Sequence, residues 1–479
     1  MKTIKTRGAG RPIVRAALAV LLLLAVAGCM APSSPPTPPP DPVDAGIGTP
    51  IEMDHDHTDS SLHRGAYNLE QVAWSSLGVV LGENGFANFV LHQQGNRTLA
   101  FVAVDGDAEG GFTVADITDP AGIQVLGDYR APGSGFQEVR VSPDGRWAFQ
   151  NVQEIPGAAV PADPVAACSA CIHVVDLADL AAPKLSSVFP VELLGTHNMD
   201  LVAYPDGLYL FYVGQPLDSD NTPGGNKVGV ARLVESPVGA ALVPVGEFRH
   251  PALLDDGRSF PHDVLVQQHP DGRRIGYVSH WDGGVVTFDA STPSALVPLG
   301  VNKEQQPSDA LAIHWTIQEE RARRDGRTIA WSAPEIGSLA TGTGAVRSYD
   351  ASDPAALRQL GTWTLPGNLS IEGQFLLSPH TVAPDMATGL VAVAHYHAGV
   401  WILDGTDPAA PKALGYAFPN GDATAGYPGP IWWKKPNFDP DGFLPNAYQA
   451  RWHDGLLWVT ERGTGLYAYR YTGPVPGPL

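Results

Sequence analysis

Apolar segments of strand length recur between about residue 67 and residue 475, and each is followed by one of two polar signals. The first signal is a turn pair with glycine in second place. It occurs seven times, at Gln94-Gly95, Asp144-Gly145, Asp206-Gly207, Asp271-Gly272, Asp325-Gly326, Thr388-Gly389 and Asp454-Gly455. Such pairs favour tight hairpins, because glycine accepts the positive φ that these turns require.

The second signal is an apolar run that closes with a charged or polar residue and then a proline. Its seven copies end at Pro120, Pro183, Pro237, Pro293, Pro354, Pro408 and Pro474. The two signals alternate without exception, and successive turn glycines lie 50 to 66 residues apart. Four strands of about six residues with their loops fill such a period. One period therefore predicts one four-stranded sheet of a repeat fold.

Seven such units predict an all-β fold, a seven-bladed β-propeller, and the 53 glycines and 44 prolines suit so turn-rich a chain. A further apolar run follows most of the prolines and is typical of an outer strand, but the seventh unit lacks one. A matching run at about residues 67–75 precedes the first unit. We expect this N-terminal strand to join the last blade and close the ring, which removes exposed sheet edges. The predicted single domain spans residues 65–475.

Two runs carry a resemblance to a known family. Residues 281–289 read Trp-Asp-Gly-Gly-Val-Val-Thr-Phe-Asp, and residues 397–408 read His-Ala-Gly-Val-Trp-Ile-Leu-Asp-Gly-Thr-Asp-Pro. They resemble the LVIVD-repeat proteins, whose signature is a glycine, an apolar strand ending in aspartate, a small residue and Asp-Pro. The chain departs from this signature where Arg232 and Arg470 replace the aspartate. The resemblance implies a β-propeller on an exported protein, and it supplies no activity.

The N-terminus predicts an exported lipoprotein. Residues 1–28 combine five basic residues with an apolar stretch of 12 residues, 16–27, which is too short to span a bilayer. The run Val26-Ala27-Gly28-Cys29 resembles the lipobox of bacterial lipoproteins, which implies that Cys29 is acylated; an ordinary signal peptide is the alternative. Several acyl chains anchor a protein stably to membrane lipid. We expect a location in the cell envelope, and Met30 favours the outer membrane of a Gram-negative cell.

Residues 29–64 predict a flexible tether. Eight prolines lie between residues 31 and 50, a composition that cannot bury a core. The following Asp-His stretch, with His55, His57 and His63, could capture a metal, although a solvated linker is the favoured interpretation. Removal of residues 1–28 takes the net charge from −20 to −25. Such a surface repels phosphate backbones, so nucleic acid is not an expected partner.

Two cysteines remain within the predicted propeller, Cys168 and Cys171. In a reducing cytosol their spacing would suggest a metal or redox motif. The lipobox places them outside the cytosol, where neighbouring thiols oxidise, so we predict a local disulfide between Cys168 and Cys171.

Four histidines each begin an apolar segment that turns back at a glycine: His197, His262, His314 and His380. The first strand of a propeller blade runs along the central channel, so these strand starts share one face. We expect the four imidazoles to meet at the channel mouth, with the loops that carry His280, His395 and His397 on the same side. The other three units offer Asn88, Gln137 and Gln449 at comparable places.

Two functions are consistent with these residues. Four neutral imidazoles around one axis suit a transition metal such as Zn, Cu or Fe, which would indicate a metal-dependent oxidase or oxygenase. Alternatively, each histidine bonds a neighbouring backbone group, and the propeller is a binding or scaffold module for a protein, glycan or small molecule. The chain has no Gly-x-Ser-x-Gly elbow, phosphate-binding glycine loop or His-Glu-x-x-His pair, so the binding module is the favoured interpretation.

Overall fold

The computed structural model describes most residues of the propeller domain, in separate ranges. The described residues are 65–78, 84–106, 109–132, 135–153, 168, 170–191, 195–214, 227–253, 260–281, 283–303, 313–335, 344–367, 377–419 and 445–479. The predicted signal peptide, Cys29 and the tether with its histidines lie outside these residues. Among the described residues, no helix has the length and apolar character needed to cross a membrane.

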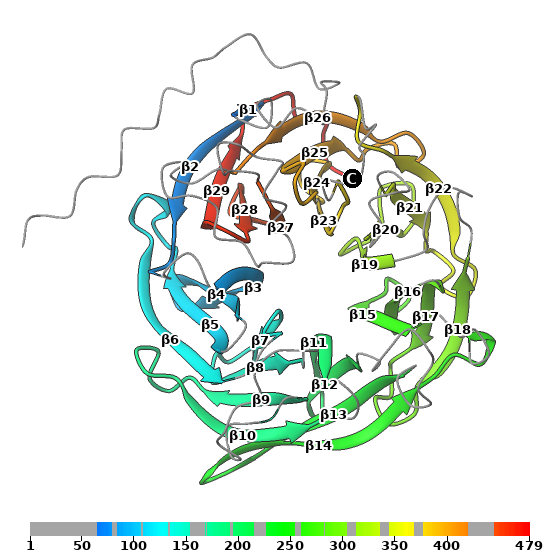
Figure 1. The fold of residues 1–479 in the computed structure, drawn as a ribbon. Coiled ribbons are helices and arrows are strands. Elements are labelled where there is room, and N and C mark those ends of the chain that lie inside the picture. Colours follow the sequence, from blue (N-terminus) through cyan, green and yellow to red (C-terminus); the bar gives the residue numbers. More distant parts are fainter. Residues whose placement is uncertain are drawn as a thin grey trace, which may run out of the picture. The chain divides into compact units, whose positions relative to one another are not determined.

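Seven antiparallel sheets form a ring around a central axis, which confirms the predicted seven-bladed β-propeller (Figure 1). Five blades are four consecutive strands. Blade 1 contains β3 (Asn84–Gln94), β4 (Arg97–Gly106), β5 (Glu109–Asp116), the 3-10 helix η2 (Pro120–Gly122) and β6 (Gln124–Pro132). Blade 2 contains β7 (Val139–Val141), β8 (Trp147–Val152), β9 (Cys171–Asp176) and β10 (Lys184–Pro190). Blade 3 contains β11 (Thr196–Tyr204), β12 (Gly207–Gly214), β13 (Val228–Ser236) and β14 (Gly239–Phe248).

The remaining blades continue this order. After the 3-10 helix η3 (Pro251–Leu253), blade 4 contains β15 (Phe260–Gln268), β16 (Arg274–Trp281), β17 (Gly284–Asp289) and β18 (Val297–Asn302). Blade 5 contains β19 (Ile313–Gln318), β20 (Ile329–Pro334), β21 (Val346–Asp350) and β22 (Arg358–Trp363). Blade 6 contains β23 (Thr381–Asp385), β24 (Leu390–Ala394), β25 (Val400–Asp404) and β26 (Lys412–Ala417). Blade 7 contains β27 (Ala447–His453), β28 (Leu456–Glu461) and β29 (Gly465–Tyr471).

The N-terminal segment closes the ring as predicted. Strand β2 (Leu69–Ser75) pairs antiparallel with β29, with Leu69 opposite Tyr471, and so supplies the missing outer strand of blade 7. A feature that the sequence pattern did not predict is β1 (Ala66–Tyr67), which pairs with β26 as a fifth strand of blade 6. The entering chain therefore joins two neighbouring blades before the first complete blade begins.

The two repeated signals of the sequence have defined structural roles. All seven turn glycines have positive φ, for example 62° at Gly95 and 74° at Gly455. Aspartates at or shortly before the proline of the second signal form Asx turns, in which Oδ1 accepts a hydrogen bond from the amide two residues later. This bond recurs at Asp119, Asp179, Asp353 and Asp407. The same local bond therefore begins the outer strand in several blades.

Glycines in the outer strands let neighbouring blades approach closely. A Cβ atom added to Gly361 of β22 would lie 2.5 Å from the carbonyl oxygen of Ala409, which follows the Asp-Pro signal of the next blade. Equivalent approaches occur at Gly127 and Gly300. Between the blades lie apolar clusters, and the cluster between blades 5 and 6 contains the fully buried Trp331 and Trp401. Contact between neighbouring blades thus depends on glycines in the outer strands and on large apolar side chains further inside.

Substitution of Gly361 by alanine is expected to lower the free energy of unfolding by about 1–3 kcal/mol, because the new methyl group overlaps a backbone carbonyl. The measurement is urea unfolding followed by tryptophan fluorescence. Gly214→Ala is the matched control, since a Cβ atom there meets only one atom, at 3.7 Å. Equal stability of the two variants would contradict the proposed role of this glycine.

His173 gives the fold a defined pH dependence. Its ring is fully buried in blade 2, where the Tyr129 hydroxyl lies 2.9 Å from Nδ1, and burial lowers the pKa of His173 to about 4. The unfolded chain takes up a proton near pH 6.5, so the stability that this neutral ring allows is complete above pH 6.5 and is lost as the pH falls toward 4.

Replacement of His173 by phenylalanine is expected to remove this dependence. The difference in unfolding free energy between variant and parent should shift in favour of the variant by about 1.4 kcal/mol per pH unit below pH 6.5. Urea unfolding at pH 7.5, 6.5 and 5.5 measures this difference. A difference that stays constant over this range would show that the native ring titrates normally.

Candidate metal centre at the propeller axis

Three of the four predicted histidines occupy the same irregularity at the start of an inner strand. The pairing register shifts between Thr196 and Met199 in β11, between Pro261 and Asp263 in β15, and between Ile313 and Trp315 in β19. The interrupted positions include His197, His262 and His314. A β-bulge of this kind takes a residue out of the ladder and redirects its side chain. His380 lies directly before β23, so it marks the corresponding end of blade 6.

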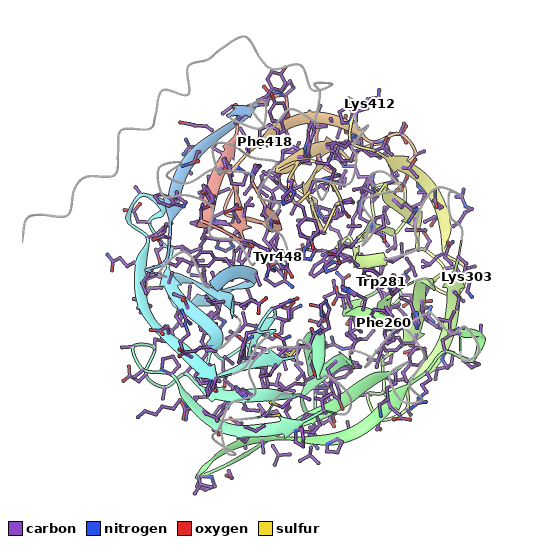
Figure 2. All side chains as sticks on the ribbon, in the orientation of Figure 1. Phe260, Trp281, Lys303, Lys412, Phe418 and Tyr448 are labelled. Carbon is purple, nitrogen blue, oxygen red and sulfur yellow. The ribbon has the colours of Figure 1, made fainter. Side chains whose placement is uncertain are left out.

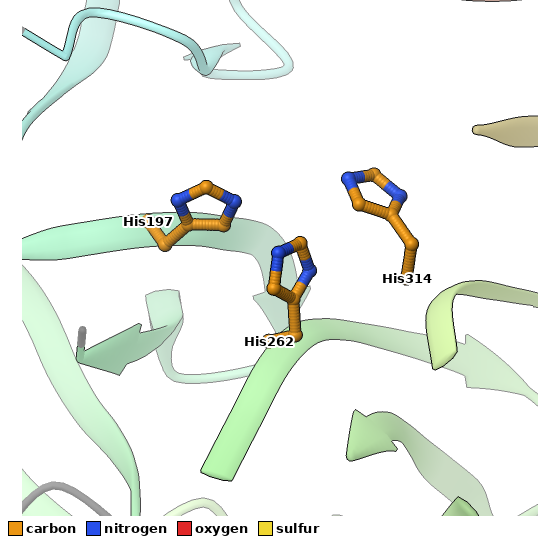
Figure 3. A group of neighbouring side chains, drawn as sticks. All are labelled: His197, His262 and His314. Carbon is orange, nitrogen blue, oxygen red and sulfur yellow. The ribbon is translucent and has the colours of Figure 1, made fainter. Parts of the chain in front are cut away.

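The four imidazoles meet at the channel mouth, as the repeat predicted. Successive ring centroids lie 4.2 Å apart from His197 to His262, 4.5 Å from His262 to His314 and 3.7 Å from His314 to His380. One ring nitrogen of each of His197, His262 and His314 lies within 4.8 Å of the other two, and Figure 3 shows these side chains projecting into one space. A second group with the same limit contains His314, Glu335 and His380.

Hydrogen bonds at Nδ1 orient three of the four rings, those of His197, His314 and His380. Nδ1 of His314 lies 2.9 Å from the carbonyl oxygen of His380, and Nδ1 of His380 lies 2.6 Å from that of Tyr448. Nδ1 of His197 lies 2.6 Å from the side-chain oxygen of Gln153. Because an oxygen of this type can only accept, Nδ1 carries the proton and Nε2 presents its lone pair. The bonding to backbone that we considered as an alternative is therefore present, and it prepares Nε2 for a metal.

Burial keeps the imidazoles neutral. It lowers the pKa of His197 to about 4 and holds the pKa values of His262, His314 and His380 well below the usual 6.5. Neighbouring imidazoles lower the pKa values of His262 and His314 further, since each disfavours a positive charge on the next. Neutral imidazole is the form that binds metal ions.

Glu335 is a site residue that the sequence analysis missed. It directly follows β20 in blade 5, and its Oε2 lies 3.8 Å from Nε2 of His262 and 3.9 Å from Nε2 of His314. Its Oε1 accepts a hydrogen bond from the Tyr396 hydroxyl. Burial raises the pKa of Glu335 to about 7, although Tyr396 and Arg462 act in the opposite direction. Glu335 follows the second strand of its blade, as His395 does, so strand direction could have placed it on this face; it was missed because only histidines were sought there.

The wall beside His380 is formed by Tyr448 and not by Gln449, so the assignment of Gln449 to this place was wrong. The Tyr448 ring lies 3.9 Å from that of His380, near the centre of the ring of blades in Figure 2. Its hydroxyl lies 3.2 Å from Oε1 of Gln137. The register shift between Ala447 and Gln449 explains the error, because it exchanges which residue faces the axis. Gln449 instead accepts a hydrogen bond from the amide of Phe89, in the neighbouring blade.

Of the three histidines that were expected in loops, His280 instead lies in β16, because that strand continues to Trp281. The side chains of His280, His395 and His397 are buried, and none of the three belongs to a group of converging ligand atoms among the described residues. The residues next to them in the sequence contact the histidine cluster instead. The Trp281 ring lies 4.8 Å from that of His262, and the Tyr396 ring lies 4.9 Å from that of His380.

The donor set fits a divalent transition metal. Zinc–nitrogen bonds are about 2.0–2.1 Å long, so two nitrogens on one ion lie at most about 4.2 Å apart. The ligand atoms of His197, His262 and His314 lie within 4.8 Å of one another, so a small inward movement brings them to bonding distance. Neutral imidazoles suit Zn, Cu and Fe alike. The residues present at this site therefore fit the transition metal of the alternative interpretation.

The predicted disulfide is not formed in the structure. Cys168 and Cys171 are free cysteines, and the Sγ of Cys171 lies 3.6 Å from the carbonyl oxygen of Cys168, toward which it directs its hydrogen. Burial raises the pKa of Cys171, whereas the hydrogen bond from Cys171 lowers the pKa of Cys168. The two thiols are therefore neighbours, and their oxidation in the envelope stays a prediction.

Comparisons with known proteins show a similarity of fold and no similarity of sequence to a known family. No protein-family model and no curated protein sequence matches the chain. Among solved structures, an inactive virginiamycin B lyase of Staphylococcus aureus with quinupristin has a TM-score of 0.47 and 9% identity, covering 85% of this chain and 99% of its own. A periplasmic gluconolactonase of Pseudomonas aeruginosa has a TM-score of 0.47 and 16% identity, covering 82% and 100%. A β-propeller domain of Myceliophteria thermophila has a TM-score of 0.44 and 14% identity, covering 81% and 98%.

Protein isolated from the envelope is expected to contain the Cys168–Cys171 disulfide. Alkylation without a reductant should then leave both cysteines unmodified, and alkylation after reduction should modify both, as read by peptide mass spectrometry. The same chain produced in the cytosol is the control, and there both thiols should react once the protein is unfolded. Alkylation of both cysteines in unreduced envelope protein would contradict the prediction.

Proposed function

We propose that the chain is an envelope-anchored β-propeller that holds one transition-metal ion at its axis and uses it on a small molecule. His197, His262, His314 and His380 would bind the ion. The observation that carries the proposal is the convergence of four imidazoles from four consecutive blades, with Nδ1 of three of them bonded to oxygen. Imidazoles that only stabilised their own blades would not need ring nitrogens within 4.8 Å of other potential ligand atoms, as they are in the two groups that share His314.

The residues of the chain would perform three tasks in such a reaction. Backbone carbonyls hold His314 and His380 in the orientation that presents Nε2. Burial keeps the imidazoles unprotonated near neutral pH. Tyr396, Tyr448 and Trp281 surround the cluster and reduce the access of water. A bound Cu or Fe ion would supply redox chemistry, and this supports an oxidase or oxygenase as the class of reaction.

The location belongs to the same proposal. The lipobox supports acylation of Cys29, which would anchor the protein to membrane lipid, and Met30 supports the outer membrane. The run at residues 397–408 supports membership of the LVIVD-repeat proteins, and the Asx turns at its aspartates agree with the repeated role of that signature. The net charge supports the expectation that nucleic acid is not a partner.

A specific observation favours the second candidate, a recognition module. Phe260 and Trp281 stack with their ring centroids 5.6 Å apart and their planes 15° apart, and both are partly exposed beside His262 (Figure 2). Aromatic side chains are common in the lining of small-molecule sites. In this alternative the mouth would bind a glycan or another small molecule, and the histidines would serve only as hydrogen-bonding groups. A bound protein would be the remaining possibility for such a module.

The metal content of the purified protein distinguishes the two candidates. The full chain, extracted in detergent, is expected to contain about one transition-metal ion per molecule, and the double variant His262→Ala, His380→Ala should lose it because two ligands are removed. Inductively coupled plasma mass spectrometry measures both. The control is His453→Ala, which changes a partly exposed histidine at the far end of β27.

Metal that remains bound in the double variant, or a parent protein that takes up none after incubation with Zn, Cu and Fe ions, would overturn the metal proposal. The recognition module would then be the better account of the mouth.

A further inference from the structure

The two groups of potential ligands at the mouth share one residue. His314 belongs both to the group with His197 and His262 and to the group with Glu335 and His380. Its Nδ1 is engaged with the carbonyl oxygen of His380, so only Nε2 can bind a metal. One nitrogen lone pair cannot serve two ions. The two groups therefore describe one mononuclear site, and not a pair of metal sites.

From this we infer that Glu335 is a ligand of the same ion through Oε2, and that Tyr396 is the residue that positions it. The inference rests on the proposed metal site and adds to it a ligand that lies outside the histidine repeat. Oε2 lies 3.8 Å and 3.9 Å from the Nε2 atoms of His262 and His314. Ligand atoms at about 2.0–2.2 Å from a common ion are separated by up to about 4.4 Å, so both distances allow Oε2 and the two nitrogens to share one ion.

The two oxygens of Glu335 have different partners. Oε1 accepts the hydrogen bond from Tyr396, and Oε2 faces the imidazoles. Only 14% of the Glu335 side chain is exposed. Since a hydrogen bond on one oxygen fixes the direction of the other, Tyr396 orients Oε2 in the way that outer residues orient the ligands of metal sites.

Tyr396 is itself held in an uncommon backbone conformation. Its φ is 40°, in the left-handed region that residues other than glycine rarely adopt. Two hydrogen bonds with Ala447 of blade 7 maintain it, since the amide of each residue donates to the carbonyl of the other at 3.0 Å. Its ring also packs against His380. Conformational strain that is maintained from several sides is typical of functional positions, and here it places one hydroxyl on one carboxylate oxygen.

The carboxylate would determine which ion the site prefers. Four neutral imidazoles leave the full charge of the ion uncompensated in a buried site, whereas an anionic oxygen removes one unit of it. Carboxylate oxygen is a hard ligand that suits divalent ions, and Cu(I) prefers sulfur. We therefore expect Glu335 to favour Cu(II) over Cu(I).

The test uses the full chain in detergent, loaded with Cu(II) as the probe. Replacement of Glu335 by glutamine should change the Cu(II) electron paramagnetic resonance spectrum and weaken Cu(II) binding by more than about tenfold, with Cu(I) binding much less affected. Glu335→Asp should recover part of the parent spectrum. Tyr396→Phe should weaken Cu(II) binding by about tenfold and retain the spectrum of a site with an oxygen ligand. The control is Tyr469→Phe, which removes another buried hydroxyl away from the mouth.

The results distinguish a failure of the proposed role of Glu335 from a failure of the proposed metal site. A parent protein that binds Cu(II), together with a Glu335→Gln variant of unchanged spectrum and affinity, would overturn the role of Glu335 and leave the histidine site standing. Equal effects of Tyr396→Phe and Tyr469→Phe would overturn the positioning role of Tyr396. A parent protein that binds neither Cu(II) nor Cu(I) would overturn both the inference and the proposed function.

Discussion

The axial centre depends on one repeated interaction. A side chain at the start of the inner strand of one blade forms a hydrogen bond with the backbone of the next blade. It joins His314 to His380, His380 to Tyr448, and the side chain of Asn198 to the carbonyl oxygen of His262 at 3.2 Å. Each bond uses a side chain of one blade and the backbone of its neighbour. For His314 and His380, the bonds that hold the blades in register at the axis therefore also decide which ring nitrogen faces the centre.

Burial turns this arrangement into a site with its own chemistry. Burial lowers the pKa of these imidazoles and neighbouring imidazoles lower it further, and together they outweigh the hydrogen bonds to carbonyl oxygens, which act in the opposite direction. Among the described residues, Glu335 is the acidic group that the distances place at the cluster, and its pKa is raised by the same burial. A divalent ion would satisfy both demands, because it provides positive charge to the carboxylate and accepts the imidazole lone pairs. The imidazole lone pairs and the carboxylate at the mouth are thus better suited to binding a cation than to binding one another.

The fold and most of the histidine cluster could be predicted because both follow from a period. Seven turn glycines and seven prolines indicated seven sheets, and the strand direction in a blade placed His197, His262, His314 and His380 at one face. The remainder lacks a period. Glu335 follows a second strand, and whether its carboxylate reaches the axis depends on side-chain packing that no spacing records. Tyr448 faces the channel in place of the expected Gln449, because a single β-bulge changes which residue of the strand points to the axis. Strand β1 has two residues, which is too short for any alternation to indicate it.

Anomalous X-ray diffraction from crystals of the metal-loaded full chain is the most direct test of the claim that the four imidazoles converge on one ion. The account predicts a single strong anomalous peak on the propeller axis, at about 2.0–2.2 Å from the Nε2 atoms of the histidines, with Nδ1 still directed to the neighbouring blade. A mouth without a peak, or imidazoles that bond to one another and to ordered water around an empty axis, would contradict it.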